Sequence, residues 1–543
     1  MSGVEKTFAL RREFFLLRKG FFPLLTFGSI LVGLYAFLDI TQGFNMWDES
    51  WFLQIAHRVM SGDVLYRDVF LGIMPLSVYL TAFFTNAFGS EILVLKAIMA
   101  LIYISTVILS GRILHQVSSG RGFPLFFGTA LLALAPPWLN GLGTPYTPLA
   151  NLLFLGCFSA ALFWLENEGR ADGTANVRRA VERSMIALAV GGTAAGLSFA
   201  SKQNVGLYAL AALLITVIIE SWDKRLSWRR LMISVSIIVL SFCLACVLVL
   251  LPVQLSGGWI KLLEYGFFNK ATYIQFARVS YFEGLQILIY LIHNQWSVEQ
   301  LTHSFNYTLF LWPFLTFGAL LIVLIRKSSR KKLTVVIIIF VAAAFFGVFP
   351  RADLVHLAYV VPELLIGLIY SWNLLKPKRP TWWVKPIQMG MVLWIGIGMS
   401  AMLATSVAKI TSAKYCVSTL PHFKGVLIED RLRNEIRTSA EALSEAAARG
   451  EQLFLLSPRA GLFYLVSGTK NPTPFDFPLA TAFGHNGEAD VISSLDRRRL
   501  SGVWVDPQIL AMPLLRPMRL LSYLENNMKP GERLGTFIPF IFR

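Results

Sequence analysis

The chain has 543 residues, of which 55% are hydrophobic and only 15% are charged. Soluble domains carry about 25% charged residues, so this composition excludes an ordinary soluble protein. The formal net charge is +17. The basic residues lie in short loops between apolar segments rather than in one patch interleaved with aromatic residues, which argues against nucleic-acid binding.

The first apolar segment, residues 21–40, follows a basic N-terminal stretch. Because no small-residue cleavage site follows it, we interpret it as an uncleaved signal anchor with a cytoplasmic N-terminus. Later apolar segments approach the ~20 residues that cross a hydrocarbon core of about 30 Å. They fall at 92–111, 123–139, 149–165, 185–200, 204–221, 231–252, 305–325, 333–349, 354–374 and 387–407. The sequence therefore predicts an all-α polytopic membrane protein with about eleven transmembrane helices.

The connecting loops give the predicted orientation. Alternate loops hold roughly two dozen Lys and Arg residues on one side of the membrane, against about seven in the opposite short loops. Basic loops face the cytoplasm, so the opposite loops and everything after the last span are predicted to be extracytoplasmic. Two of these outer loops are long, 41–91 and 253–304, and the second is rich in aromatic residues, as expected at the level of lipid headgroups.

The outer loop 41–91 carries a stripe of large apolar residues. Trp47, Trp51, Ile55 and Val59 recur every four residues, which predicts a helix lying in the membrane interface with its polar side towards water. The apolar stretch 75–88 is too short to span and predicts a re-entrant or surface helix.

The composition changes after the last predicted span. A helical pattern covers 430–448, and two strand candidates fall at 452–456 and 502–505. Strands that alternate with helical stretches predict a small extracytoplasmic α/β domain at 409–543, beside a transmembrane domain at 1–408.

An adjacent acidic pair, Asp48 and Glu49, follows the first apolar segment. Desolvation near lipid raises the pKa of a carboxyl group, and a carboxylate held against a hydroxyl can act as a general base. The pair is equally compatible with ordinary polar residues in a wet loop, and its position alone leaves both interpretations open.

Short motifs follow the acidic pair in the order Tyr66-Arg67-Asp68, Pro75-Leu76 and Gly111-Arg112, the last predicted to end a helix. In this order and spacing the chain resembles the GT-C superfamily of polytopic glycosyltransferases, in particular bacterial relatives of the protein O-mannosyltransferases and the lipid A aminoarabinose transferase. The resemblance covers roughly residues 20–410 as architecture and is sharpest over 45–112. The chain departs from the family's two prolines before the leucine, since Met74 precedes Pro75 here.

The resemblance implies a bacterial inner-membrane enzyme that transfers a sugar, with inversion, from a polyprenyl-phosphate donor. The acceptor could be a lipid, a glycan or a protein. Asp48 would be the base and Glu49 its catalytic neighbour. Tyr66 and Arg67 would contact the donor, with Asp68 in a supporting role.

A phosphate leaving group requires cations at the outer face. Lys202 and Gln203 lie in a tight predicted outer turn, and Arg351, Asp353 and His356 lie in another. We expect Lys202, Arg351 and His356 to bind the donor phosphate, and Gln203 and Asp353 to support them. The alternative is that the two cations snorkel to lipid headgroups.

Glu363 is an acidic residue inside a predicted span, two helical turns after His356 and on the same helix face. Intramembrane carboxylates mark sites or pair with a buried partner, and both options stay open. No His, Cys and Asp cluster has metal-ligand spacing, so no metal cofactor is expected. A divalent cation would require Glu49, His57 and Asp68 to meet in the fold.

A transporter or flippase of lipid-linked sugars is the main alternative to an enzyme. Such proteins show two related halves and polar residues near mid-membrane, whereas the polar candidates here gather at one face. A non-catalytic assembly scaffold is a third option.

Overall fold

The computed structural model of the chain describes residues 42–117, 143–171, 177–223, 227–269, 278–293, 306–326, 330–375, 407–480, 482–484, 486–512 and 516–543, together with a few single positions. The predicted spans 21–40, 123–139 and 387–407 lie outside the described residues except at single positions.

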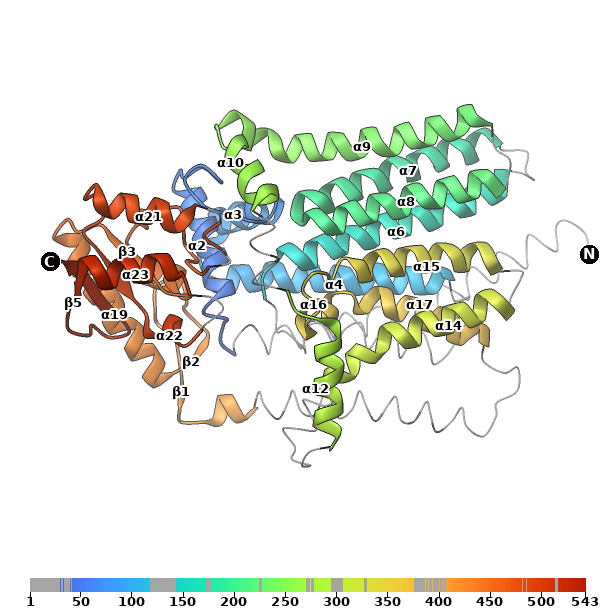
Figure 1. The fold of residues 1–543 in the computed structure, drawn as a ribbon. Coiled ribbons are helices and arrows are strands. Elements are labelled where there is room, and N and C mark those ends of the chain that lie inside the picture. Colours follow the sequence, from blue (N-terminus) through green and yellow to red (C-terminus); the bar gives the residue numbers. More distant parts are fainter. Residues whose placement is uncertain are drawn as a thin grey trace, which may run out of the picture.

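Long apolar helices run side by side in one bundle (Figure 1). They are α4 (Ile92–Val117), α6 (Tyr146–Ala171), α7 (Val177–Ser201), α8 (Gln203–Asp223), α9 (Trp228–Leu255), α14 (Trp312–Arg326), α15 (Lys331–Phe346) and α17 (Val361–Leu375). Within the described part of the chain, six helical stretches are long and apolar enough to cross a membrane. The helical membrane protein predicted from the sequence is confirmed for these residues. Because α4 runs to Val117, the expectation that this helix ends at Gly111-Arg112 is wrong.

Glycines allow α7 and α9 to pack closely. A Cβ atom at Gly192 would lie 2.5 Å from the carbonyl oxygen of Ile238, and one at Gly196 would lie 2.5 Å from that of Phe242. Small residues let membrane helices approach backbone to backbone, where van der Waals packing holds them together. The opposite side of α9 exposes large apolar side chains such as Leu240, as a lipid-facing surface does.

The predicted span 354–374 is two helices rather than one. α16 (Leu354–Tyr359) ends at Val360, and α17 begins at Val361. Pro362 lies in the first turn of α17, where its missing N–H is tolerated; in the interior of one continuous helix it would remove a hydrogen bond and clash with the preceding turn. The argument that Glu363 shares a continuous helix face with His356 is therefore wrong.

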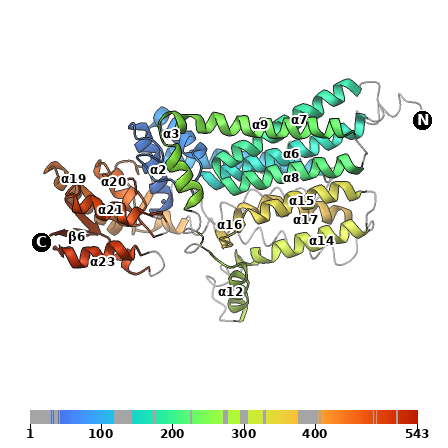
Figure 2. The ribbon, with the colours of Figure 1, turned by 45° about the horizontal axis from the view of Figure 1, so that its top comes forward.

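The first outer loop folds into α2 (Asp48–Met60) and α3 (Leu76–Phe88), which lie between the bundle and the C-terminal region (Figure 2). The short helix expected at 75–88 is confirmed. The expected orientation of α2 is wrong, because its polar residues Gln54 and Arg58 are only 3% and 5% exposed. The C-terminal region covers that side of α2.

The second outer loop, 253–304, also contains helices. They are α10 (Trp259–Leu263), a π-helical turn η1 (Glu264–Phe268) and α12 (Tyr281–His293), and a 3-10 turn η2 (Thr308–Leu311) precedes α14. In Figures 1 and 2, α12 crosses the direction of the bundle.

The C-terminal region contains a four-stranded sheet in the order β3-β4-β6-β5. β3 (Leu453–Leu456) and β4 (Gly502–Val505) are parallel, whereas β6 (Ile538–Phe542) pairs antiparallel with β4 and with β5 (Met528–Pro530). The strands β3 and β4 and the helix α19 (Asp430–Ala448) confirm the three elements expected here. The sequence interpretation missed β5, β6 and the small hairpin of β1 (Tyr415–Val417) and β2 (Leu427–Glu429). The remaining helices are α20 (Ala460–Ser467), α21 (Gly487–Asp496), α22 (Pro507–Leu510) and α23 (Met518–Asn527).

Two hydrophobic cores result. One lies among the helices of the bundle. The other joins the first outer loop to the C-terminal sheet, since Phe52 and Leu53 of α2 belong to the same buried cluster as Phe454 of β3 and Phe463 of α20. The C-terminal region is therefore packed onto the first outer loop.

Candidate functional site

The N-terminus of α2 separates the two adjacent carboxylates. The side chain of Asn45 accepts hydrogen bonds from the backbone N–H groups of Trp47 and Asp48, at 2.9 and 3.1 Å. The backbone N–H of Asn45 donates in return to Glu49 Oε2 at 3.1 Å. This reciprocal cap starts the helix and turns Glu49 inwards, while Asp48 remains exposed.

Glu49 is 3% exposed and forms an ion pair with Lys96 of α4, with 3.9 Å between Oε2 and Nζ. Lys96 is equally buried, at 3%. The sequence interpretation missed Lys96, although a lysine in the predicted span 92–111 was a signal, because ionisable residues within spans usually have a partner. The pair ties the start of α2 to the bundle.

Asp48 lies within electrostatic range of Arg351, which comes from the turn before α16. The Asp48 side chain has solvent-accessible surface, but many protein atoms lie around its carboxyl group. The resulting desolvation raises the pKa of Asp48, and the positive charge of Arg351 partly offsets this rise. A base near an acceptor hydroxyl benefits from a raised pKa, provided that it is still ionised at working pH.

The turn that carries Arg351 is ordered by hydrogen bonds. Arg351 Nε donates to Asp353 Oδ2 at 2.6 Å, and Asp353 Oδ1 lies 2.7 Å from His356 Nδ1. Asp353 also caps α16, accepting from the backbone N–H of His356 at 2.9 Å. Burial alone would raise the pKa of Asp353. The hydrogen bonds and charge of His356, together with the charge of Arg351, outweigh this effect and lower the pKa, so the carboxylate stays ionised. The Arg351 side chain is 45% exposed and can be approached by an anion from solvent.

Lys202 joins the same region from the turn between α7 and α8. Its Nζ lies 5.9 Å from the centroid of the Tyr146 ring, which stacks on Phe52 of α2 at 6.4 Å. The charges of Lys202 and Arg351 both act on His356. The neighbouring Gln203 donates to the carbonyl of Gly266 in η1 at 3.1 Å, which fixes this turn against the second outer loop.

The structure therefore gathers residues from three distant parts of the chain at one end of the bundle. A general-base candidate, two cations and their supporting side chains share this place: Asp48, Lys202, Arg351, Asp353 and His356. The arrangement can hold an anionic group beside a carboxylate.

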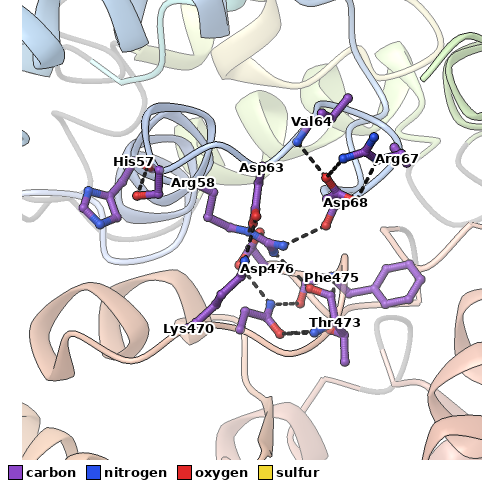
Figure 3. A network of polar contacts seen from close by, with 12 residues as sticks. His57, Arg58, Asp63, Val64, Arg67, Asp68, Lys470, Thr473, Phe475 and Asp476 are labelled. Carbon is purple, nitrogen blue, oxygen red and sulfur yellow. Dashed lines mark hydrogen bonds and ion pairs between the residues drawn. The ribbon is translucent and has the colours of Figure 1, made fainter. Parts of the chain in front are cut away.

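The Tyr66-Arg67-Asp68 motif forms hydrogen bonds within the first outer loop and one to the second outer loop. Tyr66 is 0% exposed, and its hydroxyl donates to the carbonyl of Ile73 at 2.7 Å. Arg67 donates to Asp68 at 2.8 and 3.0 Å and to the carbonyl of Ser256 at 3.3 Å. Figure 3 shows the contact between Arg67 and Asp68. The Tyr66 hydroxyl is thus engaged within the fold, whereas Arg67 is 53% exposed.

Glu363 lies in the first turn of α17 and is 1% exposed. Neither carboxylate oxygen has a hydrogen-bond partner among the described residues. The structure leaves its supporting role as a prediction.

Three side chains named for a possible cation have different neighbours. Glu49 pairs with Lys96, the His57 ring lies 5.1 Å from that of His422, and Asp68 bonds Arg67. In the described part of the chain, no three His, Cys, Asp or Glu side chains converge as a metal site requires.

A polar network around the buried Arg58 and Asp476 was not predicted from the sequence. Arg58 of α2 donates to Asp63 and Asp476, each at 2.8 Å, and Lys470 donates to Asp63 at 2.8 Å (Figure 3). Asp476 follows Arg58 by 418 positions, so no local pattern could have revealed the pair.

The sequence matches no protein-family model and no curated protein. Solved structures do match. ArnT from Cupriavidus metallidurans in the apo state aligns with a TM-score of 0.54 and 14% identity, over 96% of this chain and 98% of that one. The same protein bound to undecaprenyl phosphate gives 0.52 and 13%, over 95% and 97%.

The archaeal oligosaccharyltransferase AglB from Archaeoglobus fulgidus, in complex with an inhibitory peptide and a dolichol-phosphate, aligns with a TM-score of 0.54 and 11% identity, over 96% of this chain and 74% of that one. At such identities the likeness concerns the fold. ArnT, the lipid A aminoarabinose transferase, and AglB are both members of the GT-C superfamily, so the GT-C resemblance seen in the sequence is confirmed at the level of fold.

Proposed function

We propose that the protein is an integral-membrane glycosyltransferase of GT-C type. It moves a hexosyl or pentosyl group, with inversion, from a polyprenyl-phosphate donor to a lipid, glycan or protein acceptor outside the cytoplasm. The fold shared with ArnT and AglB, whose structures hold undecaprenyl phosphate and dolichol-phosphate, supports a donor of this class.

The observation that supports the proposal is that Asp48 lies within electrostatic range of Arg351, while the charges of both Arg351 and Lys202 act on the neighbouring His356. A sugar phosphate must lose an anionic leaving group while a hydroxyl loses a proton. The two events need a cation and a base on either side of one carbon atom, and this region contains both.

The reaction follows from these groups. The acceptor hydroxyl oxygen forms a bond to the anomeric carbon and releases its proton to Asp48. The bond from that carbon to the phosphate oxygen breaks on the opposite face, which inverts the configuration. The leaving polyprenyl phosphate takes the bonding electron pair, and Arg351 and Lys202 stabilise its charge.

The remaining residues have supporting roles in this scheme. Asp353 and His356 orient the Arg351 turn, and Gln203 holds the Lys202 turn in place. Arg67, backed by Asp68, is a second exposed cation for the donor. We do not assign the buried Tyr66 hydroxyl to the phosphate. Glu49 positions α2 through Lys96, and Glu363 retains a proposed supporting role within the bundle.

We further propose about eleven spans in a bacterial inner membrane, with a cytoplasmic N-terminus and an extracytoplasmic C-terminal domain. The C-terminal region and the outer-loop helices α2, α3 and α10 lie together at one end of the bundle, which supports this orientation (Figure 1). The residue chemistry favours a reaction without a metal cofactor, because Arg351 and Lys202 supply the positive charge.

A flippase of lipid-linked sugars is the alternative, and a proteoliposome experiment separates the two. Donors with a radiolabelled sugar on a short-chain polyprenyl phosphate are supplied with candidate acceptors. An enzyme converts the donor accessible on its active side into labelled product without moving lipid between leaflets. Transbilayer movement of intact donor without product would contradict the proposal.

A further inference from the structure

We propose that Arg58 is a positioning residue that couples the C-terminal region to the catalytic helix α2. The inference rests on the proposed function in one respect, namely that Asp48 at the other end of α2 is the base. It gives the C-terminal region a defined part in the reaction, as the outer wall that fixes the orientation of α2.

Arg58 uses its whole guanidinium group in the network of Figure 3. Nε donates to Asp63, Nη1 donates to Asp476 and to the carbonyl of Thr473 at 2.9 Å, and Nη2 donates to the carbonyl of Asp68 at 2.7 Å. The side chains of Arg58 and Asp476 are 6% and 1% exposed. A planar fork with several donors fixes direction as well as distance, which a lysine ammonium does not.

The contacts of α2 with the C-terminal region extend along its length. A Cβ atom at Gly461 of α20 would lie 3.0 Å from the Cα atom of Trp51, so the two helices touch backbone to backbone close to Asp48. The Trp51 ring lies 5.6 Å from that of Phe477, immediately after Asp476. The C-terminal region therefore contacts α2 near its first turn, at Trp51, and forms hydrogen bonds to it in its last turn, at Arg58.

The opposite side of α2 rests on the bundle through the Glu49–Lys96 pair and the Phe52–Tyr146 stack. Tyr146 also lies under Lys202. Contacts on both sides therefore hold α2 in place. If the Arg58 contacts are lost, α2 can rotate, and this rotation would move Asp48 relative to Arg351 and Lys202. Interiors are close-packed, so such a helix shifts as a unit rather than absorbing the change locally.

The experiment compares three full-length variants in detergent or nanodiscs. Arg58→Lys keeps the charge but loses the fork, and Asp476→Asn keeps the shape but loses the charge. Arg449→Lys is the matched control, because Arg449 forms an exposed ion pair with Glu451 in the same region. The folded, monodisperse fraction of each is used.

The first measurement is amide hydrogen exchange of peptides covering residues 47–60, which needs no activity. We expect exchange about tenfold faster in Arg58→Lys and Asp476→Asn, with the membrane helices and the control unchanged. Unchanged exchange in α2 would overturn the proposal, whether or not the protein transfers sugar.

The second measurement separates positioning from general loss of structure. Asp476→Asn should lower kcat per folded protein about tenfold or more while the KM for the donor stays within about twofold. Arg351 and Lys202 lie on other turns, and this variant keeps the hydrogen bond from Arg58 to the Asp68 carbonyl beside Arg67. A rise in KM with unchanged kcat would overturn the proposal. If the wild type transfers no sugar, the proposed function fails, and hydrogen exchange still decides whether Arg58 anchors α2.

Discussion

Asp48 and Arg351, which are far apart in the sequence, interact electrostatically in the fold. Desolvation raises the pKa of Asp48, and the charge of Arg351 partly offsets this rise. The relationship couples the two halves of the proposed reaction. The cation that would stabilise the departing phosphate also favours the ionised form of the base. Perturbed carboxyl groups beside a specific charge partner are characteristic of functional sites.

Asp48→Asn should abolish transfer while the protein folds normally. Loss of a general base lowers kcat by about 100- to 10,000-fold. Asp430→Asn is a suitable control, since Asp430 pairs with Arg433 on an exposed helix face. Single-turnover transfer from a labelled donor measures the effect. Turnover within a few-fold of wild type would remove Asp48 from the mechanism.

The same Asp48 variant should be slightly more stable than the wild type at neutral pH. The pKa of Asp48 is raised in the folded state, so its contribution to stability is largest below the unfolded pKa and declines as pH rises through the folded value. The neutral asparagine removes this cost. Thermal unfolding at pH 7.5 and pH 4 should show a gain for the variant that shrinks at the lower pH; a gain of equal size at both would contradict it.

Arg351→Gln should shift the pH profile of transfer. Without the guanidinium, desolvation acts unopposed and the pKa of Asp48 rises further, so the acidic limb of kcat/KM moves to higher pH. Loss of phosphate stabilisation should also lower kcat by about 100- to 1,000-fold. Arg351→Lys retains the charge and should keep the limb near its wild-type position. A limb that does not move in Arg351→Gln would show that Asp48 is not the titrating base.

The sequence could predict what depends on local pattern. Apolar runs located α4, α6, α7, α8, α9, α14 and α15, a helical pattern located α19, and short apolar runs located β3 and β4. The helices α10 and α12 were not predicted, because their region was interpreted only as an outer loop. Two exceptions to the positive-inside pattern, Lys202 and Arg351, were found because charges in short outer turns stand out locally. The structure then placed both within electrostatic range of His356.

Contacts between distant segments were out of reach. Nothing in the sequence near Arg58 identifies Asp476 as its partner. The polar side of α2 was expected to face water. It is covered instead by the C-terminal region, which follows hundreds of residues later in the chain. The break at Val360 was missed because the apolar character continues across it. Glu49 was grouped with Asp48 by adjacency, although neighbouring residues on a helix point about 100° apart.

The buried Glu49–Lys96 pair gives a prediction about stability. Removing one partner from a buried ion pair leaves an uncompensated charge and costs about 3–5 kcal/mol, so Glu49→Gln and Lys96→Met should each unfold more readily. The double variant should recover most of the loss. Denaturant unfolding of the purified protein tests this coupling. If the two losses simply add in the double variant, the pair contributes no interaction of its own.

Two glycines in the bundle should respond to the same substitution in opposite directions. Gly→Ala within a helix ordinarily stabilises by about 1 kcal/mol. Among the described residues, no atom lies within 4 Å of a Cβ added at Gly318 of α14, so Gly318→Ala should raise Tm. A Cβ at Gly196 would lie 2.5 Å from the carbonyl oxygen of Phe242, which must force α7 and α9 apart. Overpacking of this kind costs about 1–3 kcal/mol, so Gly196→Ala should lower Tm despite the gain in helix propensity. Thermal unfolding of the two variants in one detergent compares them directly, and an increase in Tm for Gly196→Ala would show that these helices are not in backbone contact.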